Sequence, residues 1–270
     1  MITEEEQAWL SRLEDGMFPL IEAWAQRTRT GPVTAQPGSS LARDDEVYPA
    51  LPPSHLAYGG IVTATEHLDF FRTSFQANRT LYPASHFTLL RTALMGAAQA
   101  VWVLKGPRAQ RCERALRLVR DDIQQQRGLL NDVAAQLAPE DCAAQQQILD
   151  RRLREVQDAA AALGLNPAKV RGWKLFMTEV IREASELVHQ DDEDAWYGTS
   201  LLWRLQSGHA HGTPSARIRQ ILPDQIEHRA NGMLWGKFEA SFADVGCAAA
   251  GAFLLLKEAW WLYDQRCQSI

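Results

Sequence analysis

The segment HFTLLRTALMGAAQAVWVL (His86–Leu104) constrains the fold more than any other part of the chain. It is apolar on nearly every side of a helix, with alanine and glycine where close helix packing requires small residues. Lys105, Gly106 and Pro107 form a stop signal directly after it. Because such a helix is stable only when other helices surround it, we place it at the centre of a helical bundle.

Further segments with helical periodicity occupy most of the remaining sequence. Thr3 and Glu6 form a capping-box pattern before the first segment, and Pro19 is expected to divide it. The predicted helices span residues 3–24, 61–78, 86–104, 108–137, 139–163, 173–189, 195–207 and 242–266, with an acidic cap at 191–194. Residues 108–163 are typical of an antiparallel helical hairpin. The fold class is therefore all-α, a multi-helix bundle in a single domain of residues 1–270.

Two regions lack helical periodicity. Residues 31–60 are rich in proline, serine and glycine, and they predict a long extended loop near the N-terminus. Within residues 215–238, an alternating pattern surrounds Asn231-Gly232, a dipeptide favoured in two-residue hairpin turns. We therefore expect a small β-hairpin insert in an otherwise helical chain.

Composition and charge narrow the possible functions. The chain has 270 residues and a formal net charge of −5, which argues against a surface built for long nucleic-acid tracts. Its four cysteines show no CxxC spacing, so neither a zinc knuckle nor a disulfide scaffold is indicated. The longest apolar run, Val245–Leu256, is too short to cross a bilayer, and the acidic N-terminus does not resemble a signal peptide. We expect a cytoplasmic protein that has no membrane partner and needs no cofactor.

The stretch WRLQSGHAHGTP (Trp203–Pro214) is the part of the sequence that most suggests chemistry. Gly212 and Pro214 are typical of a helix end, where histidines interact with free carbonyl groups, and this is the simplest interpretation. A metal site is a second interpretation, because His209 and His211 could share an ion if the helix ended before them. Its further ligands would come from His189, Asp191 or His228.

Phosphodiester cleavage is the third interpretation. Four residues separate Arg204 from His209, and on a helix that ends near Ser207 the two side chains could face one pocket. A histidine titrates near neutrality and can move the proton of a ribose 2′-hydroxyl, while an arginine stabilises charge on the phosphoryl oxygens. In this interpretation Arg204 holds the phosphate, and His209 or His211 is the acid and base. Ser207 and His211 are candidate orienting groups, and no metal ion is required.

The Arg204–His209 spacing resembles the R-x(4–6)-H motif of the HEPN superfamily, a group of small all-helical proteins. The segments RTALMGAAQAVWVL (Arg91–Leu104) and LLWRLQSGHAHG (Leu201–Gly212) are also similar to those of an uncharacterised group of bacterial helical proteins. The resemblance covers residues 66–212. It implies a metal-independent ribonuclease of toxin–antitoxin or antiviral systems, with RNA as its substrate and a homodimer in which two motifs face one cleft.

Residues 108–163 support an alternative function. Their arginines repeat every three residues, which spreads them around a helix as a solvated surface with Glu113 and Asp121 as partners, or in part as a basic ridge for RNA. The hairpin could instead bind a protein partner, which would make the chain a non-catalytic scaffold. The arginines in question are Arg108, Arg111, Arg114, Arg117 and Arg120.

Clusters of acidic residues support a second alternative. Asp121-Asp122, Asn131-Asp132 and Asp191–Asp194 are candidates for holding Mg²⁺ against a diphosphate, as an all-α enzyme can do. The chain would then be a magnesium-dependent enzyme that acts on a small molecule.

Overall fold

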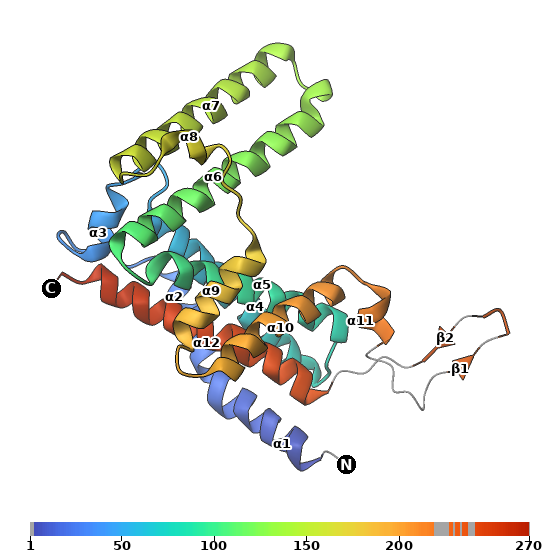
Figure 1. Ribbon diagram of the computed structural model, residues 1–270. Coiled ribbons are helices and arrows are strands. Elements are labelled where there is room, and N and C mark those ends of the chain that lie inside the picture. Colours follow the sequence, from blue (N-terminus) through green and yellow to red (C-terminus); the bar gives the residue numbers. More distant parts are fainter. Residues whose placement is uncertain (1–2, 219–226, 229, 233, 237–240, 270) are drawn as a thin grey trace. The chain divides into compact units, whose positions relative to one another are not determined.

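The computed structural model describes residues 3–218, 227–228, 230–232, 234–236 and 241–269, and most of them are helical (Figure 1). Contacts divide the chain into two compact units. The first unit contains Met1–Pro32, Gly59–Val101 and Ile181–Trp260, and the second contains Val33–Tyr58, Trp102–Val180 and Trp261–Ile270. Each unit is built from three segments that are distant in the sequence, and the single domain of residues 1–270 stays a prediction.

The helices are distributed unevenly between the two units. The first unit contains α1 (Glu4–Ser11), a π-helical stretch (Arg12–Met17), α2 (Phe18–Arg29), α10 (Glu193–Ala210) and α11 (Pro214–Ile218). It also contains most of α4 (Pro53–Asn78), α5 (Pro83–Leu104), α9 (Met177–Val188) and α12 (Phe242–Cys267). The second unit contains α3 (Ser40–Asp45), α6 (Arg108–Val133), a 3₁₀ turn (Ala134–Gln136), α7 (Pro139–Ala162) and α8 (Pro167–Val170).

Helix α5 is buried along most of its length in the first unit, as its apolar sequence predicts. Leu90, Leu94 and Ala97 are fully buried. Gly96 lies directly against Gly60 of α4, because a Cβ atom on Gly96 would lie 2.6 Å from the carbonyl oxygen of Gly60. The two backbones thus approach as closely as glycine alone permits, and the expected use of small residues in α5 is confirmed.

The N-terminal helices begin and divide as the sequence predicts. The Thr3 hydroxyl accepts a hydrogen bond from the backbone N–H of Glu6, and the Glu6 carboxylate accepts one from the backbone N–H of Thr3. Before Pro19 the chain passes through a π-helical stretch, and α2 then starts with Pro19 in its first turn. Proline is tolerated there because its missing N–H would have no partner within the helix.

Helices α6 and α7 lie side by side as a hairpin in the second unit (Figure 1). Each contributes one apolar stripe to the interface between them, because their buried residues recur at helical spacing. The stripe on α6 includes Leu116, Val119 and Ile123, and the stripe on α7 includes Leu149, Leu153 and Val156.

A buried ion pair joins α6 to α3 within the second unit. The Arg111 guanidinium donates to both carboxylate oxygens of Asp44 at 2.7 and 3.0 Å, and its remaining arm donates to the carbonyl oxygen of Gly106. Both charged side chains are almost fully buried. A buried pair with several hydrogen bonds is strongly destabilising to break, because the remaining charge would lose its partner.

The predicted loop over residues 31–60 is shorter in the structure. Ser39 caps α3 by accepting a hydrogen bond from the backbone N–H of Ala42, and α4 already begins at Pro53. Of the prolines that suggested an extended loop, Pro37 and Pro49 lie in turns, and Pro53 is the first residue of a helix, where its fixed φ angle is compatible with helix formation.

The predicted β-hairpin insert near residues 215–238 is wrong, and the chain is all-α. The segment opens with helix α11 instead of the alternating strand that we expected. Extended pairing among the described residues is limited to two residues on each side, Glu227–His228 and Leu234–Trp235. The Asn231-Gly232 signal was therefore local, because a turn dipeptide does not create a hairpin insert without longer flanking strands. Residues 219–226, 229, 233 and 237–240 lie outside the described residues.

Within the described residues, two helices are long and apolar enough to cross a membrane when length and composition alone are considered. They are α5 and α12, and 67% of the apolar window of each is buried within the protein. A mostly buried core helix passes the same test, so length and composition alone do not assign α5 or α12 to a membrane.

Candidate functional site

Helix α10 carries Arg204, Ser207 and His209, three of the residues that the sequence predicted for phosphodiester cleavage. Asp192 caps its start by accepting a hydrogen bond from the backbone N–H of Ala195, as predicted for the acidic cluster. The helix does not end near Ser207 but continues to Ala210, and His211 is its C-cap residue. Gly212 follows with a φ angle of +61°, a left-handed conformation that glycine adopts without strain.

The longer helix keeps Arg204 and His209 apart. Five positions on a continuous α-helix correspond to a rotation of about 140°, so the two side chains leave the helix in different directions. Arg204 is exposed and makes no hydrogen bond or ion pair with any other described residue. The His209 ring is half-buried and stacks on Phe87 of α5, with ring centroids 4.5 Å apart and planes inclined by 14°.

A different arginine meets this part of α10. Arg91 of α5 donates from Nε to the hydroxyl oxygen of Ser207 at 3.0 Å, and its guanidinium lies 4.1 Å from the ring centroid of Trp203. The Ser207 hydroxyl in turn donates to the carbonyl oxygen of Trp203 at 2.7 Å. We call Phe87, Arg91, Trp203, Ser207 and His209 the α5–α10 seam.

The charge of Arg91 is only partly compensated. Burial lowers the pKa of Arg91, and in the described part of the chain no carboxylate lies within ion-pair distance of its guanidinium. The carbonyl groups at the end of α10 supply only partial negative charge. The face of Trp203 adds a cation–π attraction. The Nη groups of Arg91 therefore remain available to an anion.

A second unsatisfied group lies beside the seam. Gln206 is only 1% exposed, and neither its amide nitrogen nor its amide oxygen has a hydrogen-bond partner among the described residues. Buried amides almost always have partners, and an unpaired one is costly. The helix turn that holds Ser207 therefore also contains a buried amide whose donor and acceptor have no partner among the described residues.

No other histidine among the described side chains joins this site in a group of metal ligands. His211 is exposed at the helix end, where its backbone N–H donates to the carbonyl oxygen of Ser207. Across the described ranges no group of three His, Cys, Asp or Glu side chains is placed to hold a metal ion. The side chain of His228 lies outside the described residues.

The arginines of α6 have structural partners. Arg114 donates to the carbonyl oxygens of Trp102 and Lys105, and Arg120 donates to that of Arg171. Arg117 pairs with Glu113 at 2.7 Å, as predicted. Arg114 and Arg120 join α6 to other segments of the second unit, and Arg117 pairs within the helix. These contacts leave little of the predicted basic ridge for RNA.

Residues of the acidic clusters also have structural partners. The Asp122 carboxylate accepts hydrogen bonds from Arg152 at 3.1 Å and Gln126 at 2.7 Å. Burial raises the pKa of its neighbour Asp121. Asp192 is used as a helix cap. This arrangement does not favour a magnesium–diphosphate site.

No protein-family model, curated protein or solved structure matches the chain. The possible function of the seam is therefore inferred from its own residues. Sequence reasoning missed Arg91 as a site residue, although one signal was present: it is the one charged residue in the apolar segment His86–Leu104. A charged residue that interrupts such a helix needs either a partner or a function.

Proposed function

We propose that the α5–α10 seam binds the phosphate of RNA and that the chain is a metal-independent ribonuclease, or a module derived from one. The observation that carries the proposal is a half-buried arginine that has no described carboxylate partner and lies in the same seam as a histidine. The resemblance to HEPN proteins suggests a role in a toxin–antitoxin or phage-defence system. A ribonuclease of such a system would act on RNA in the cytoplasm, which is the location that we propose for the protein.

In this proposal Arg91 takes the role first considered for Arg204. Its Nη groups would bind the phosphoryl oxygens, because a guanidinium fork matches their geometry and their developing charge. Ser207 would orient Arg91 through the hydrogen bond to its Nε. His209 would take the proton from a ribose 2′-hydroxyl or give one to the leaving oxygen, and its stack on Phe87 would hold the ring. His211, exposed at the helix end, is the second candidate for proton transfer.

Cleavage of a labelled single-stranded RNA in the presence of EDTA tests this function. His209→Phe preserves the stack on Phe87 but removes the titratable nitrogens, so we expect about a 100-fold loss of rate or more. Arg91→Gln is expected to reduce the rate by about 100-fold. Arg204→Gln is the matched control and should remain within about twofold of the parent. Cleavage that persists in His209→Phe and His211→Ala, or that requires Mg²⁺, would contradict the proposal.

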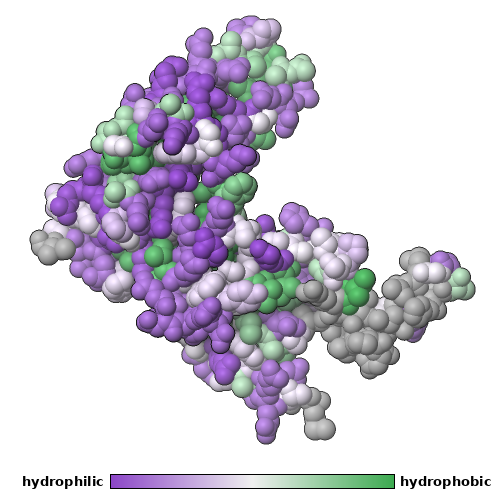
Figure 2. Space-filling view, viewed as in Figure 1, coloured by the Kyte–Doolittle hydropathy of each residue, from purple (hydrophilic) through white to green (hydrophobic). Residues whose placement is uncertain are grey.

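A second candidate is a protein-interaction module in which the hairpin of residues 108–163 binds a second copy of the chain. The large apolar residues near its closed end are exposed, with Leu129 at 66% and Val133, Leu137 and Ile148 at 38% each. Figure 2 shows hydrophobic residues at this end of the hairpin. The surrounding charges have both signs, for example Asp132 and Arg151, which suits a self-complementary two-fold interface.

The molar mass in solution tests this second candidate. The chain has a mass of 30.3 kDa, and light scattering after size exclusion should give twice that value for the parent. A double variant, Leu129→Glu with Val133→Glu, should be monomeric. Asp158→Asn, which changes an exposed residue near the other end of α7, is the control and should remain dimeric. A monomeric parent, or a dimer that the double variant leaves intact, would contradict this assignment.

A further inference from the structure

A small pocket of about 70 Å³ lies within the second unit, between α6, α7 and the end of α8. This volume holds a few waters or one small anion, and it is far below that of a drug-sized site. Three of the six lining residues are arginines, and none of the lining residues that the structure describes is acidic. The lining consists of Arg120, Ile123, Gln124 and Arg127 from α6, Leu153 from α7, and Arg171, the C-cap residue of α8. We call it the arginine pocket.

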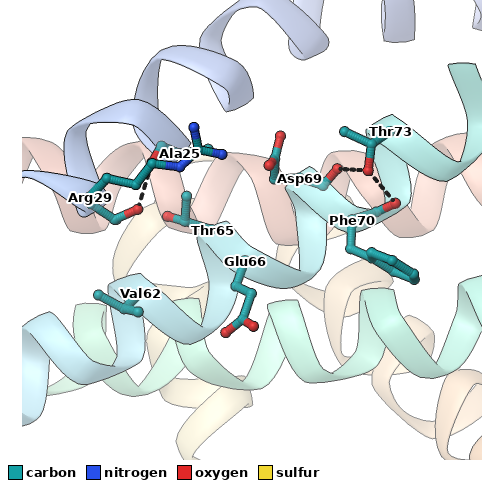
Figure 3. Close-up of a pocket in the computed structure, with 9 residues that line it drawn as sticks. Ala25, Arg29, Val62, Thr65, Glu66, Asp69, Phe70 and Thr73 are labelled. Carbon is teal, nitrogen blue, oxygen red and sulfur yellow. Dashed lines mark hydrogen bonds between the residues drawn. The ribbon is translucent and has the colours of Figure 1, made fainter.

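A larger pocket between α2 and α4 has a different lining. Its volume is about 340 Å³, and it includes both signs of charge. Figure 3 shows that Glu66 points away from α2, whereas Asp69 lies on the same side of this pocket as Arg29. A carboxylate of the protein thus accompanies the arginine there. The arginine pocket has no such carboxylate in its described lining, so its charge favours an anion that the protein itself does not supply.

Two arginines of the arginine pocket keep donors that no described residue uses. Arg171 is exposed, and its guanidinium makes no hydrogen bond or ion pair with the described residues. Arg120 donates from Nη2 to the carbonyl oxygen of Arg171. This bond holds the Arg120 guanidinium beside the end of α8, while its Nε and Nη1 have no hydrogen-bond partner in the described part of the chain.

The third arginine, Arg127, is held by one ion pair. Its Nη2 donates to a carboxylate oxygen of Asp150. Its Nε is buried and has no hydrogen-bond partner among the described residues, and its Nη1 makes no hydrogen bond with them either. A buried donor without a partner is costly and requires an explanation. The described contacts within the protein therefore do not account for the position of this guanidinium.

The charge of the arginine pocket matches that of a dianion. The three guanidiniums carry three positive charges, and Asp150 is the one described carboxylate within ion-pair distance of any of them. Two positive charges thus remain around a small volume, and an anion between them would remove their mutual repulsion. Ile123 and Leu153 are buried beneath the pocket, and an apolar wall strengthens the attraction because it excludes water.

We propose that the arginine pocket binds a phosphate dianion, either as free inorganic phosphate or as the terminal phosphate of a small phosphomonoester. Arg120, Arg127 and Arg171 would donate to its oxygens, because guanidinium groups match phosphate in geometry and charge. A phosphodiester would fit less well, since it carries one negative charge and has substituents on two oxygens. The arginine pocket shares no residue with the α5–α10 seam, so this proposal and the ribonuclease proposal can fail separately.

Isothermal titration calorimetry at low salt and about pH 8 tests the ligand class, because a phosphate group carries about two negative charges there. The probes are inorganic phosphate, O-phospho-L-serine and dimethyl phosphate, which is a monoanionic diester. We expect a dissociation constant of about 1 mM or lower for at least one of the two dianions, and binding of dimethyl phosphate that is about tenfold weaker or worse.

The two dianions also distinguish the source of the phosphate. Tighter binding of phosphoserine would identify a phosphomonoester as the ligand, and tighter binding of inorganic phosphate would identify the free ion. Dimethyl phosphate that binds as tightly as the dianions would overturn the proposal. The proposal would also be overturned if neither dianion bound.

Variants of the lining test the assignment of residues. Arg171→Gln removes a guanidinium without a described partner, so the protein should melt at the parent temperature in the absence of phosphate while phosphate binds about tenfold more weakly. Arg127→Lys keeps a positive charge beside Asp150 but removes the guanidinium fork, and it should weaken binding by a similar factor. Arg154→Gln removes the same charge from an exposed position of α7 outside the lining, and the affinity should stay within about twofold of the parent. Unchanged affinity in Arg171→Gln and Arg127→Lys, or an equal loss in Arg154→Gln, would contradict the site.

Discussion

Helices α5 and α6 follow each other in the sequence, but they are stabilised in different ways. In α6 the arginines are committed to structure, because Arg111 pairs with Asp44, and Arg114 donates to backbone carbonyls. In α5 close packing of small residues dominates, as the contact of Gly96 with Gly60 shows. The single arginine of α5, Arg91, has a hydroxyl and an indole ring as its contacts. Counting the partners of an arginine therefore locates a candidate anion site better than counting arginines.

The largest expected effect is the loss of the buried pair in the second unit. Asp44→Asn leaves the Arg111 charge buried without a carboxylate, so we expect the free energy of unfolding to fall by about 3–5 kcal/mol. Glu113→Gln breaks the pair of Glu113 with Arg117, which is more exposed than the pair of Asp44 with Arg111, and should cost about 1 kcal/mol or less. Chemical denaturation measures both changes. Similar losses in the two variants would show that burial does not determine how much each ion pair of α6 contributes to stability.

Packing of α5 against α4 should have the next largest effect. Gly96→Ala places a Cβ atom 2.6 Å from the carbonyl oxygen of Gly60, and we expect a loss of about 2 kcal/mol. Gly59→Ala is the matched control, because a Cβ at that position meets no atom within 4 Å. It should stabilise α4 by up to about 1 kcal/mol through helix propensity. A stable Gly96→Ala variant would contradict the close approach of the two helices.

Removal of the α5 arginine should cost little stability. Arg91→Gln loses one hydrogen bond and one cation–π contact, so we expect about 1 kcal/mol by chemical denaturation. The comparison of α5 with α6 predicts that Arg91→Gln lowers the free energy of unfolding much less than Asp44→Asn does. A loss of 3 kcal/mol or more, the range expected for a broken buried pair, would make Arg91 a structural residue like those of α6.

The smallest expected effect depends on pH and belongs to the start of α5. His86 is 1% exposed, its Nδ1 accepts from the backbone N–H of Tyr82 at 3.3 Å, and its Nε2 lies 3.3 Å from the Ser74 hydroxyl oxygen. Burial lowers the pKa of His86 below its ordinary value of 6.5. The unfolded chain then binds the proton more readily, so the free energy of unfolding falls as pH decreases below about 6.5.

Urea denaturation between pH 7.5 and 5 measures this dependence. The variant His86→Asn should lose part of the slope, because an asparagine can accept the Tyr82 hydrogen bond without titrating. The difference between parent and variant isolates His86 from the other titrating groups. A parent whose stability rises as the pH decreases would contradict the assigned direction of the pKa shift.

The sequence was most informative where local patterns decide the structure. The apolar segment of α5, the capping box at Thr3 and the cap at Asp192 depend on neighbouring residues, and all three were predicted correctly. The pair Asp44–Arg111 joins residues 67 positions apart, which no local pattern reveals. The short helix α3 was missed because the surrounding prolines and glycines suggested a loop.

The candidate site also shows that local patterns do not reveal contacts between distant residues. The cleavage interpretation ended α10 near Ser207, but the helix continues to Ala210, and Gly212 follows its end as the simplest interpretation expected. The difference of one turn decides whether Arg204 and His209 can meet. The contact of Arg91 with Ser207 spans 116 positions and depends on how α5 packs against α10. A position in the sequence indicates which residues could react, whereas packing decides which ones meet.

The most direct test of the central claim is the affinity of the protein for a labelled single-stranded RNA, measured by fluorescence anisotropy in EDTA at fixed salt. The claim is that the α5 arginine, and not the exposed arginine of α10, holds phosphate. We predict that Arg91→Gln weakens binding by about tenfold or more, since a charge-assisted hydrogen bond is lost, while Arg204→Gln changes it by less than about twofold. Equal losses in the two variants, or a loss confined to Arg204→Gln, would contradict the account.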